Sequence, residues 1–342
     1  MAYETGTATG PNDLLQKLVA FLTGPAVGWT QDMSQTDGTG WRAHLHKSSV
    51  YVNLKSTTGA VNPWGVSPSP TPISTSAAMH LYLGTGFNGG ANWNAQAGGP
   101  LLSGTGTITG VSMPLPTGAI TSYHFFSDST GDNIAVVVEK TTGIFAHLGW
   151  GTSLNKSGSF TGGPYFFGAK NAYNFADTST FNFGAQNGPT TRMPFAYVDS
   201  GNGPAATGYV RADVDSFTGK WLGCTNSTAQ PSGGYTGKNL ASEYRGTTAP
   251  PGEIPNVEML FERATSSFNS QAHLIPVRIW AARDAGGYSL LGVVPGVFWT
   301  NATGHTAGAT LNPPPGYSAG AVITLGADSY VIFPFFAVKK VT

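Results

Sequence analysis

Apolar residues near the start of the chain recur at the spacing of an α-helix. One helical face would carry the apolar residues Leu14, Leu15, Leu18, Val19 and Leu22. Pro11 and Asp13 suit a first helical turn, because proline needs no N–H there and a carboxylate favours the positive end of a helix. Gly24 and Pro25 would end the helix. The pattern predicts a helix over about residues 12–23, short enough to need packing on a sheet.

Most of the remaining chain has the period of β-strands. Residues 49–55 alternate between apolar and polar side chains. Residues 134–138 are almost continuously apolar, which is typical of a central strand. The sequence Asp-Ser-Thr-Gly-Asp at 128–132 is a turn signal that leads into this strand. A last hairpin is predicted over 321–333, with its turn at 326–328.

These patterns predict a mainly β protein with antiparallel, β-sandwich-like sheets, one short N-terminal helix and long glycine-rich loops. The length of 342 residues suggests two domains or one large β-rich domain. The prolines between residues 250 and 255 mark the best candidate for a linker. We expect an N-terminal β-rich domain over 1–245, a proline-rich linker over 246–256 and a C-terminal β domain over 257–342.

The composition agrees with a folded chain that contains many turns. The 47 glycines and 23 prolines exceed ordinary usage, and glycine suits turns that require positive φ. Charged residues make up only 10% of the chain, but aromatic residues make up 12% and provide large rings to bury. The 17 basic and 17 acidic residues cancel, which argues against nucleic acid or an anionic membrane as the main partner. The balance also leaves little repulsion between identical copies.

Signals for secretion, membrane insertion and disulfides are lacking from the sequence. The first residues contain no basic stretch followed by an apolar run, so we expect no signal peptide and folding in a cytoplasm. No apolar stretch approaches the ~20 residues that span a bilayer. Cys224 is the single cysteine, which excludes an intrachain disulfide and a cysteine-based zinc site.

The carboxylates form no strong catalytic pattern. Glu258 and Glu262 lie on a predicted strand, where they would be solvated charges on one face rather than the pair that glycoside hydrolysis needs. Asp213 and Asp215 faintly resemble a calcium loop but lack its terminal bidentate Glu. A polar strand edge with a turn is the favoured interpretation of this pair, with a bound cation as the alternative.

The histidines and nucleophiles lead to the same conclusion. His44 and His46 would share one face of a strand, and a metal is conceivable there, but zinc needs three or four ligands. Packing is the favoured interpretation of this pair, and His147 is expected to be structural as well. No nucleophile elbow and no phosphate loop occurs. We therefore expect no enzyme, no metal and no cofactor.

Aromatic residues near the glycine-rich segments are the remaining candidates for a site. The candidate interface or ligand-binding rings are Trp64, Trp93, Trp150, Tyr165 and Phe166. Exposed tryptophans of this kind could stack on sugars, as in a lectin. They could equally anchor a protein interface, where Trp and Tyr are enriched. The interface is the favoured interpretation.

Several segments resemble a family of tailed-bacteriophage virion proteins. The start of the chain is similar to the start of that family at Tyr-Glu-Thr-Gly-Thr-Ala-Thr-Gly (3–10), Asp-Leu-Leu-Gln-Lys-Leu (13–18) and Gly-Trp-Thr (28–30). Further similar segments are 123–128, 133–139, 145–151, 162–165 and the hairpin at 322–333. They are spread from one end of the chain to the other. Each motif has low specificity, and their order is more specific.

The resemblance implies a structural role in the particle and no catalytic residues. Copies of the same chain and other virion proteins are then the expected partners, and the protein is made in the host bacterial cytoplasm and located in the virion. A neck or collar, tail or baseplate position stays open. A receptor-binding tail tip or spike that contacts a host-surface glycan is the alternative. A polysaccharide-degrading enzyme would require two carboxylates that converge in a cleft.

Overall fold

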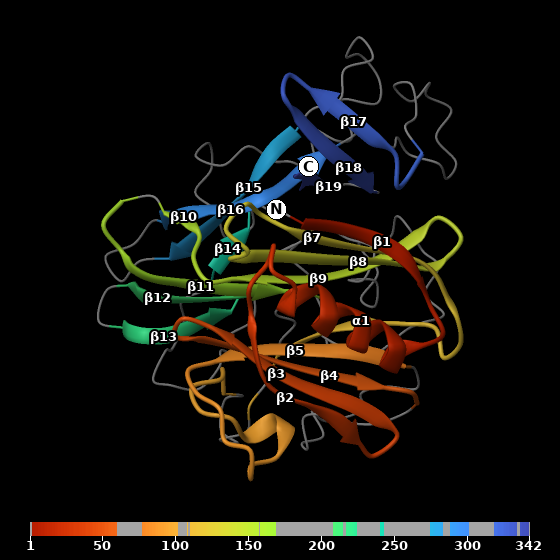
Figure 1. Ribbon diagram of the computed structural model, residues 1–342. Coiled ribbons are helices and arrows are strands. Elements are labelled where there is room, and N and C mark those ends of the chain that lie inside the picture. The colour runs from red at the N-terminus through yellow and green to blue at the C-terminus, as the bar shows by residue number, and fades with distance from the viewer. Residues whose placement is uncertain are drawn as a thin grey trace, which may run out of the picture.

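The computed structural model describes residues 2–59, 77–101, 108, 110–156, 158–168, 208–214, 217–223, 240–242, 274–282, 288–300, 318–333 and 336–341. Over these residues the chain is mainly β, with three antiparallel sheets and one α-helix (Figure 1). The predicted fold class is therefore confirmed. No helix in the described part is long and apolar enough to cross a membrane.

The three sheets are stacked in layers (Figure 1). The central sheet has the strand order β1 (Ala2–Ala8), β7 (Ile120–Ser127), β8 (Asn133–Thr141), β9 (Ile144–Gly151), β11 (Thr161–Phe167), β12 (Gly208–Val214) and β13 (Phe217–Gly223). The N-terminal sheet has the order β2 (Thr30–Asp37), β3 (Gly40–Lys47), β4 (Val50–Thr57), β5 (Ala78–Gly84) and β6 (Val111–Pro114). The C-terminal sheet has the order β14 (Leu240–Ser242), β15 (Leu274–Ala282), β16 (Tyr288–Thr300), β19 (Phe336–Lys340), β18 (Asp328–Phe333) and β17 (Val322–Leu325), and β10 (Asn155–Lys156) pairs with β16.

Helix α1 (Pro11–Thr23) lies between the central and N-terminal sheets (Figure 1). It begins one residue before the predicted start, and Leu14, Leu15, Leu18 and Leu22 are fully buried. The helix contacts β1 and β7 on one side and β2 to β5 on the other. A three-turn helix gains little stability from its own hydrogen bonds, so this double packing is what holds it.

The central sheet is covered on both faces, which explains the near-continuous apolar run in β8. Ile134, Val136 and Val138 belong to the large core shared with α1 and the N-terminal sheet. Ala135 and Val137 face the opposite way and pack with the C-terminal sheet. Successive side chains of a strand point to opposite faces, so a strand buried on both sides has no polar positions to alternate with.

The C-terminal sheet packs on the central sheet through β18 and β19. Its contribution to the shared cluster is Val331, Phe333, Phe336 and Val338. The sheet also includes β10 and β14, which precede residue 245, so its strands are not all drawn from the predicted C-terminal domain. The predicted linker over 246–256 lies outside the described residues, and the two-domain division stays a prediction. The last hairpin is confirmed, with Leu325 paired to Asp328 across its turn.

Candidate functional site

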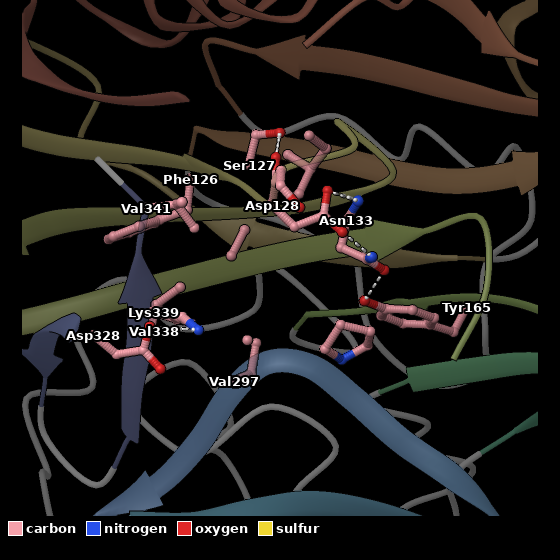
Figure 2. A pocket seen from close by; sticks show the side chains of 15 residues that line it. Phe126, Ser127, Asp128, Asn133, Tyr165, Val297, Asp328, Val338, Lys339 and Val341 are labelled. Atoms are coloured by element: carbon pink, nitrogen blue, oxygen red, sulfur yellow. Dashed lines mark hydrogen bonds and ion pairs between the residues drawn. The ribbon is translucent and has the colours of Figure 1, made fainter. Parts of the chain in front are cut away.

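A pocket of about 210 Å³ lies where the central and C-terminal sheets meet. The β7–β8 turn, β8 and Tyr165 of β11 form its central-sheet side, and β16, β18 and β19 form the other side. Figure 2 shows the Asp328–Lys339 pair at one side of the pocket and Asp128, Asn133 and Tyr165 at another. The pocket is smaller than the ~300–1,000 Å³ typical of small-molecule sites.

The β7–β8 turn is built around the carboxylate of Asp128. This carboxylate accepts hydrogen bonds from the Asp132 amide at 2.9 Å, from the Thr130 hydroxyl at 3.1 Å and from the Asn133 amide at 3.3 Å. The Asn133 side-chain amide donates a further bond at 2.5 Å. Gly131 has φ of +74°, and an added Cβ would lie 2.0 Å from the Val27 carbonyl oxygen. The turn predicted from Asp-Ser-Thr-Gly-Asp is therefore confirmed, with the physical reason for its glycine.

Asn133 connects this turn to β11. The Tyr165 hydroxyl donates a hydrogen bond to the Asn133 side-chain oxygen at 2.8 Å, and the Asn133 side-chain nitrogen donates to the Asp128 carboxylate. Burial, together with the charge of Asp128, raises the pKa of Tyr165 well above its usual range. Tyr165 is therefore a neutral hydrogen-bond donor at ordinary pH, and its hydroxyl positions the side-chain amide of Asn133.

The opposite side of the pocket results from an irregularity in β16. Val297 pairs with Val338 of β19, whereas Val293 pairs with β10 and β15. Between them lie Pro295, which lacks an N–H, and Gly296, which has φ of +71°. The strand therefore leaves β19 at this point, and the gap it leaves is part of the pocket.

The two carboxylates that line the pocket are already engaged. Asp128 holds the turn through four donors, and Asp328 forms an ion pair with Lys339 at 2.8 Å. A glycosidase needs one carboxyl group as an acid and one as a base or nucleophile. Asp128 would have to give up the bonds that form its turn in order to serve in such a pair.

The apolar part of the pocket is formed by Phe126, Ile134, Ala135, Val297 and Val338.

The predicted carboxylate pairs are only partly described. Asp213 accepts from the Thr161 hydroxyl and from the Gly219 amide, and these two bonds lower the pKa of Asp213. It thus links β12 to β11 and β13, and the interpretation of Asp213 and Asp215 as a polar strand edge with a turn stays a prediction. Asp215, Glu258 and Glu262 lie outside the described residues.

His44 and His46, the predicted histidine pair, each have a structural partner. His44 bonds through Nδ1 to the Asn53 side-chain oxygen at 2.7 Å, and His46 bonds to the Asp32 carboxylate at 2.9 Å. Asp32 sits at a register shift in β2, which brings it beside His46 although it is distant in sequence. No group of three or more metal-binding side chains occurs among the residues that the structure describes.

Two further histidines lie on the side of the central sheet that faces the C-terminal sheet. His124 contacts the Tyr3 hydroxyl through Nδ1 at 2.9 Å and the Ser122 hydroxyl through Nε2 at 3.2 Å. Its ring lies 5.2 Å from that of Phe333. The His147 ring lies 5.0 Å from that of Phe336, and its Nδ1 has no hydrogen-bond partner. Burial lowers the pKa of His124 to about 4 and that of His147 to about 3, so both stay neutral at pH 7.

The expectation that the candidate tryptophans are exposed is wrong for Trp93 and Trp150, and the candidate rings Tyr165 and Phe166 are buried as well. Trp93 is 3% exposed, Trp150 and Phe166 are 0% exposed, and Tyr165 is 1% exposed. Trp64 lies outside the described residues. The four rings cannot meet a sugar or a neighbouring subunit in this conformation.

The glycines beside these rings explain the error. An added Cβ at Gly149 would lie 2.4 Å from the Phe167 ring, and one at Gly151 would lie 2.4 Å from the Tyr165 ring. The glycines of β9 therefore make room for the rings of β11, its neighbour in the sheet. Glycine next to aromatic residues here indicates close packing between strands instead of a mobile loop that presents its rings.

Sequence reasoning did not find most of the pocket. Its lining comes from residues 126–129, 133–135, 165, 295–297, 328, 338, 339 and 341, which are far apart along the chain. Only the Asp128 turn had a local signal. The pairing of β18 with β19 brings Lys339 beside Asp328. The predicted hairpin contained Asp328, but the sequence analysis did not predict that the last strand would pair with it.

The chain was compared with models of known protein families and with curated protein sequences. No family model matches it, and no curated protein matches it.

Proposed function

We propose that the protein is a non-enzymatic structural component of a tailed-phage virion, in the neck or collar or associated with the tail. In this role it assembles through interfaces with other copies of itself and with other virion proteins. The sequence resemblance and the balanced charge support this proposal. The engagement of Asp128 and Asp328 in structural bonds supports it as well, because a particle protein needs a rigid scaffold more than free reactive groups.

The exposed edge of the C-terminal sheet is the observation that carries the proposal. Among the described residues, the exposed large apolar side chains are Leu101, Val322 and Leu325. Val322 and Leu325 both belong to β17, the last strand in the order of that sheet. An apolar edge strand is a surface that other chains can extend, and proteins without such a role usually protect it.

Antibody labelling of purified phage particles tests the proposal. Gold-labelled antibody raised against this chain should mark intact particles at one reproducible position, seen by negative-stain electron microscopy. Particles without the corresponding gene product serve as the control. Intact particles that carry no label would contradict the proposal.

The receptor-binding alternative is weakened by the burial of its named rings. It required Trp93 or Trp150 to be exposed beside polar groups, and neither is. A sugar-binding surface would have to use other residues.

A further inference from the structure

Most edge strands of the described sheets carry features that hinder pairing with another chain. β1 contains Glu4, β2 contains Asp32 and Asp37, and both strands have a shift in register with their neighbour. β13 contains Lys220 and also pairs irregularly. β6 ends in Pro114, and β14 has only three residues. Charge, irregular register, proline and shortness all discourage the addition of a further strand.

β17 differs from these edges in its sequence and in its exposure. It reads Val-Ile-Thr-Leu, with no charge and no proline, and its register with β18 is regular over all of its residues. Val322, Thr324 and Leu325 are exposed, and Val322 and Leu325 each keep 48% of their surface accessible. Apart from its length of four residues, β17 has none of the protection that the other edges have.

The backbone of β17 has a defined direction. Ile332 donates its amide to the Ala321 carbonyl at 2.9 Å, so that carbonyl points toward β18, whereas the Ala321 N–H donates to the Ser318 carbonyl. Backbone groups alternate in direction along an antiparallel strand, so the N–H and C=O groups of Ile323 and Leu325 point toward β18. The N–H and C=O groups of Val322 and Thr324 therefore point outward, where no described strand pairs with them.

We propose that β17 pairs with β17 of a second copy of this chain, antiparallel and centred on Thr324. This inference deepens the proposed function and rests on it, because it names the surface and the partner of one assembly contact. Thr324 lies opposite Thr324 of the second copy, and the two residues exchange both backbone hydrogen bonds. Ile323 then lies opposite Leu325 of the second copy, and the reverse pair follows from the two-fold axis.

The side chains and charges around β17 fit a second copy in this register. An antiparallel pairing centred on Thr324 places the same face of the two sheets on the same side. Ile323 of one copy and Leu325 of the other therefore form cross-strand apolar pairs. These pairs extend the cluster that contains Ile323 and Tyr330. The nearby charges of Asp328 and Lys339 neutralise each other at 2.8 Å, and the chain as a whole has a net charge of zero. Two copies therefore approach without like-charge repulsion.

Cysteine cross-linking tests the register directly. Thr324→Cys is introduced into the full chain together with Cys224→Ser, which removes the native thiol. In the proposed pairing the two Cα atoms at position 324 are about 5.5 Å apart, within disulfide range. Mild oxidation should convert most of the purified chain to a covalent dimer on a non-reducing gel.

Val322→Cys in the same background is the matched control, because it is on the same exposed strand and shares a face with Thr324. Its counterpart in the second copy lies well beyond the ~7 Å limit for a disulfide. It should stay monomeric on the gel. A Thr324→Cys variant that does not cross-link, or a Val322→Cys variant that cross-links equally well, overturns the proposed pairing.

A second measurement uses no cysteine. Thr324→Lys should shift the species found by sedimentation velocity toward the smaller assembly, because it places two lysines opposite each other. Thr36→Lys makes the same change on exposed β2 and should leave the assembly unchanged. An unchanged Thr324→Lys assembly overturns the pairing. Labelled particles without the cross-link would reject the pairing alone, and a cross-link without labelled particles would reject the virion role alone.

Discussion

The two faces of the central sheet are packed very differently. The face toward α1 and the N-terminal sheet belongs to a large cluster of buried apolar and aromatic residues. The face toward the C-terminal sheet belongs to a small cluster, where Phe333 and Phe336 contact His124 and His147. The same strands β7, β8 and β9 contribute to both. One face therefore forms the main core, whereas the other is a smaller junction that contains two neutral histidines.

The largest expected effect is in the main core. Trp150→Ala removes a fully buried ring that meets the Trp29 ring edge-on at 6.0 Å. The loss should be roughly 3–5 kcal/mol of unfolding free energy, measured by urea denaturation, and the whole described fold should lose stability together. Trp150→Phe is the matched variant and should cost less, because the Trp150 Nε1 has no hydrogen-bond partner to lose. A Trp150→Ala cost below about 1 kcal/mol would remove the distinction between the two faces.

Acid should act on the junction with the C-terminal sheet. Burial holds the pKa of His147 at about 3, below its ordinary 6.5, so the unfolded chain binds more protons between these values. The stability that neutral His147 provides is complete above pH 6.5 and is lost as the pH falls toward 3, at about 1.4 kcal/mol for each unit. His124, with its pKa of about 4, contributes in the same direction.

The measurement is unfolding free energy against pH for the native chain and for His147→Leu. The variant should show a shallower fall between pH 6 and pH 3 because it no longer takes up that proton. His80→Leu makes the same test in the N-terminal sheet and should also make the fall shallower, since burial lowers the pKa of His80 to about 3 as well. If His147→Leu leaves the slope unchanged, protonation of His147 does not cause the loss of stability in acid.

A smaller effect is expected from a conservative change in the junction. Phe333→Leu keeps an apolar side chain but removes ring contacts with His124, Phe126 and Phe145. The expected cost is about 1 kcal/mol. Amide hydrogen exchange should quicken in β17 to β19 while β3 to β5 keep their protection. Equal acceleration in both regions would show that the junction and the main core unfold as one unit.

The smallest effect is expected at the rim of the pocket. The side chains of Lys339 and Asp328 are 35% and 44% exposed, so solvent screens their ion pair. Lys339→Ala should cost about 0.2–1 kcal/mol, and 1 M salt should reduce the difference. Asp328→Asn in a double-mutant cycle isolates the pair. A coupling above about 2 kcal/mol would mean that the junction depends on this pair more than on its rings.

Local patterns predicted much of the fold. The helix follows from leucines at helical spacing, and the hairpin of β17 and β18 follows from two short strands around a glycine turn. The run in β8 was identified as central because it lacks polar positions. Asp128 was placed in a turn because its neighbours Gly131 and Asp132 are turn residues. Each of these predictions depends on residues within a few positions of each other, where backbone preferences act directly.

The sequence by itself determined the period of the strands, the helix, the turns and the absence of net charge. Only the tertiary structure decided which rings are buried. The Trp150 ring packs against Trp29, which is distant along the chain, and the Tyr165 ring occupies the space beside Gly151 of the neighbouring strand. It also decided that Pro295 and Gly296 open a pocket against Asp128, and that β17 is the last strand of its sheet in the part of the chain that the structure describes. These outcomes depend on which strands become neighbours, and that choice is made by the burial of whole faces rather than by any local preference.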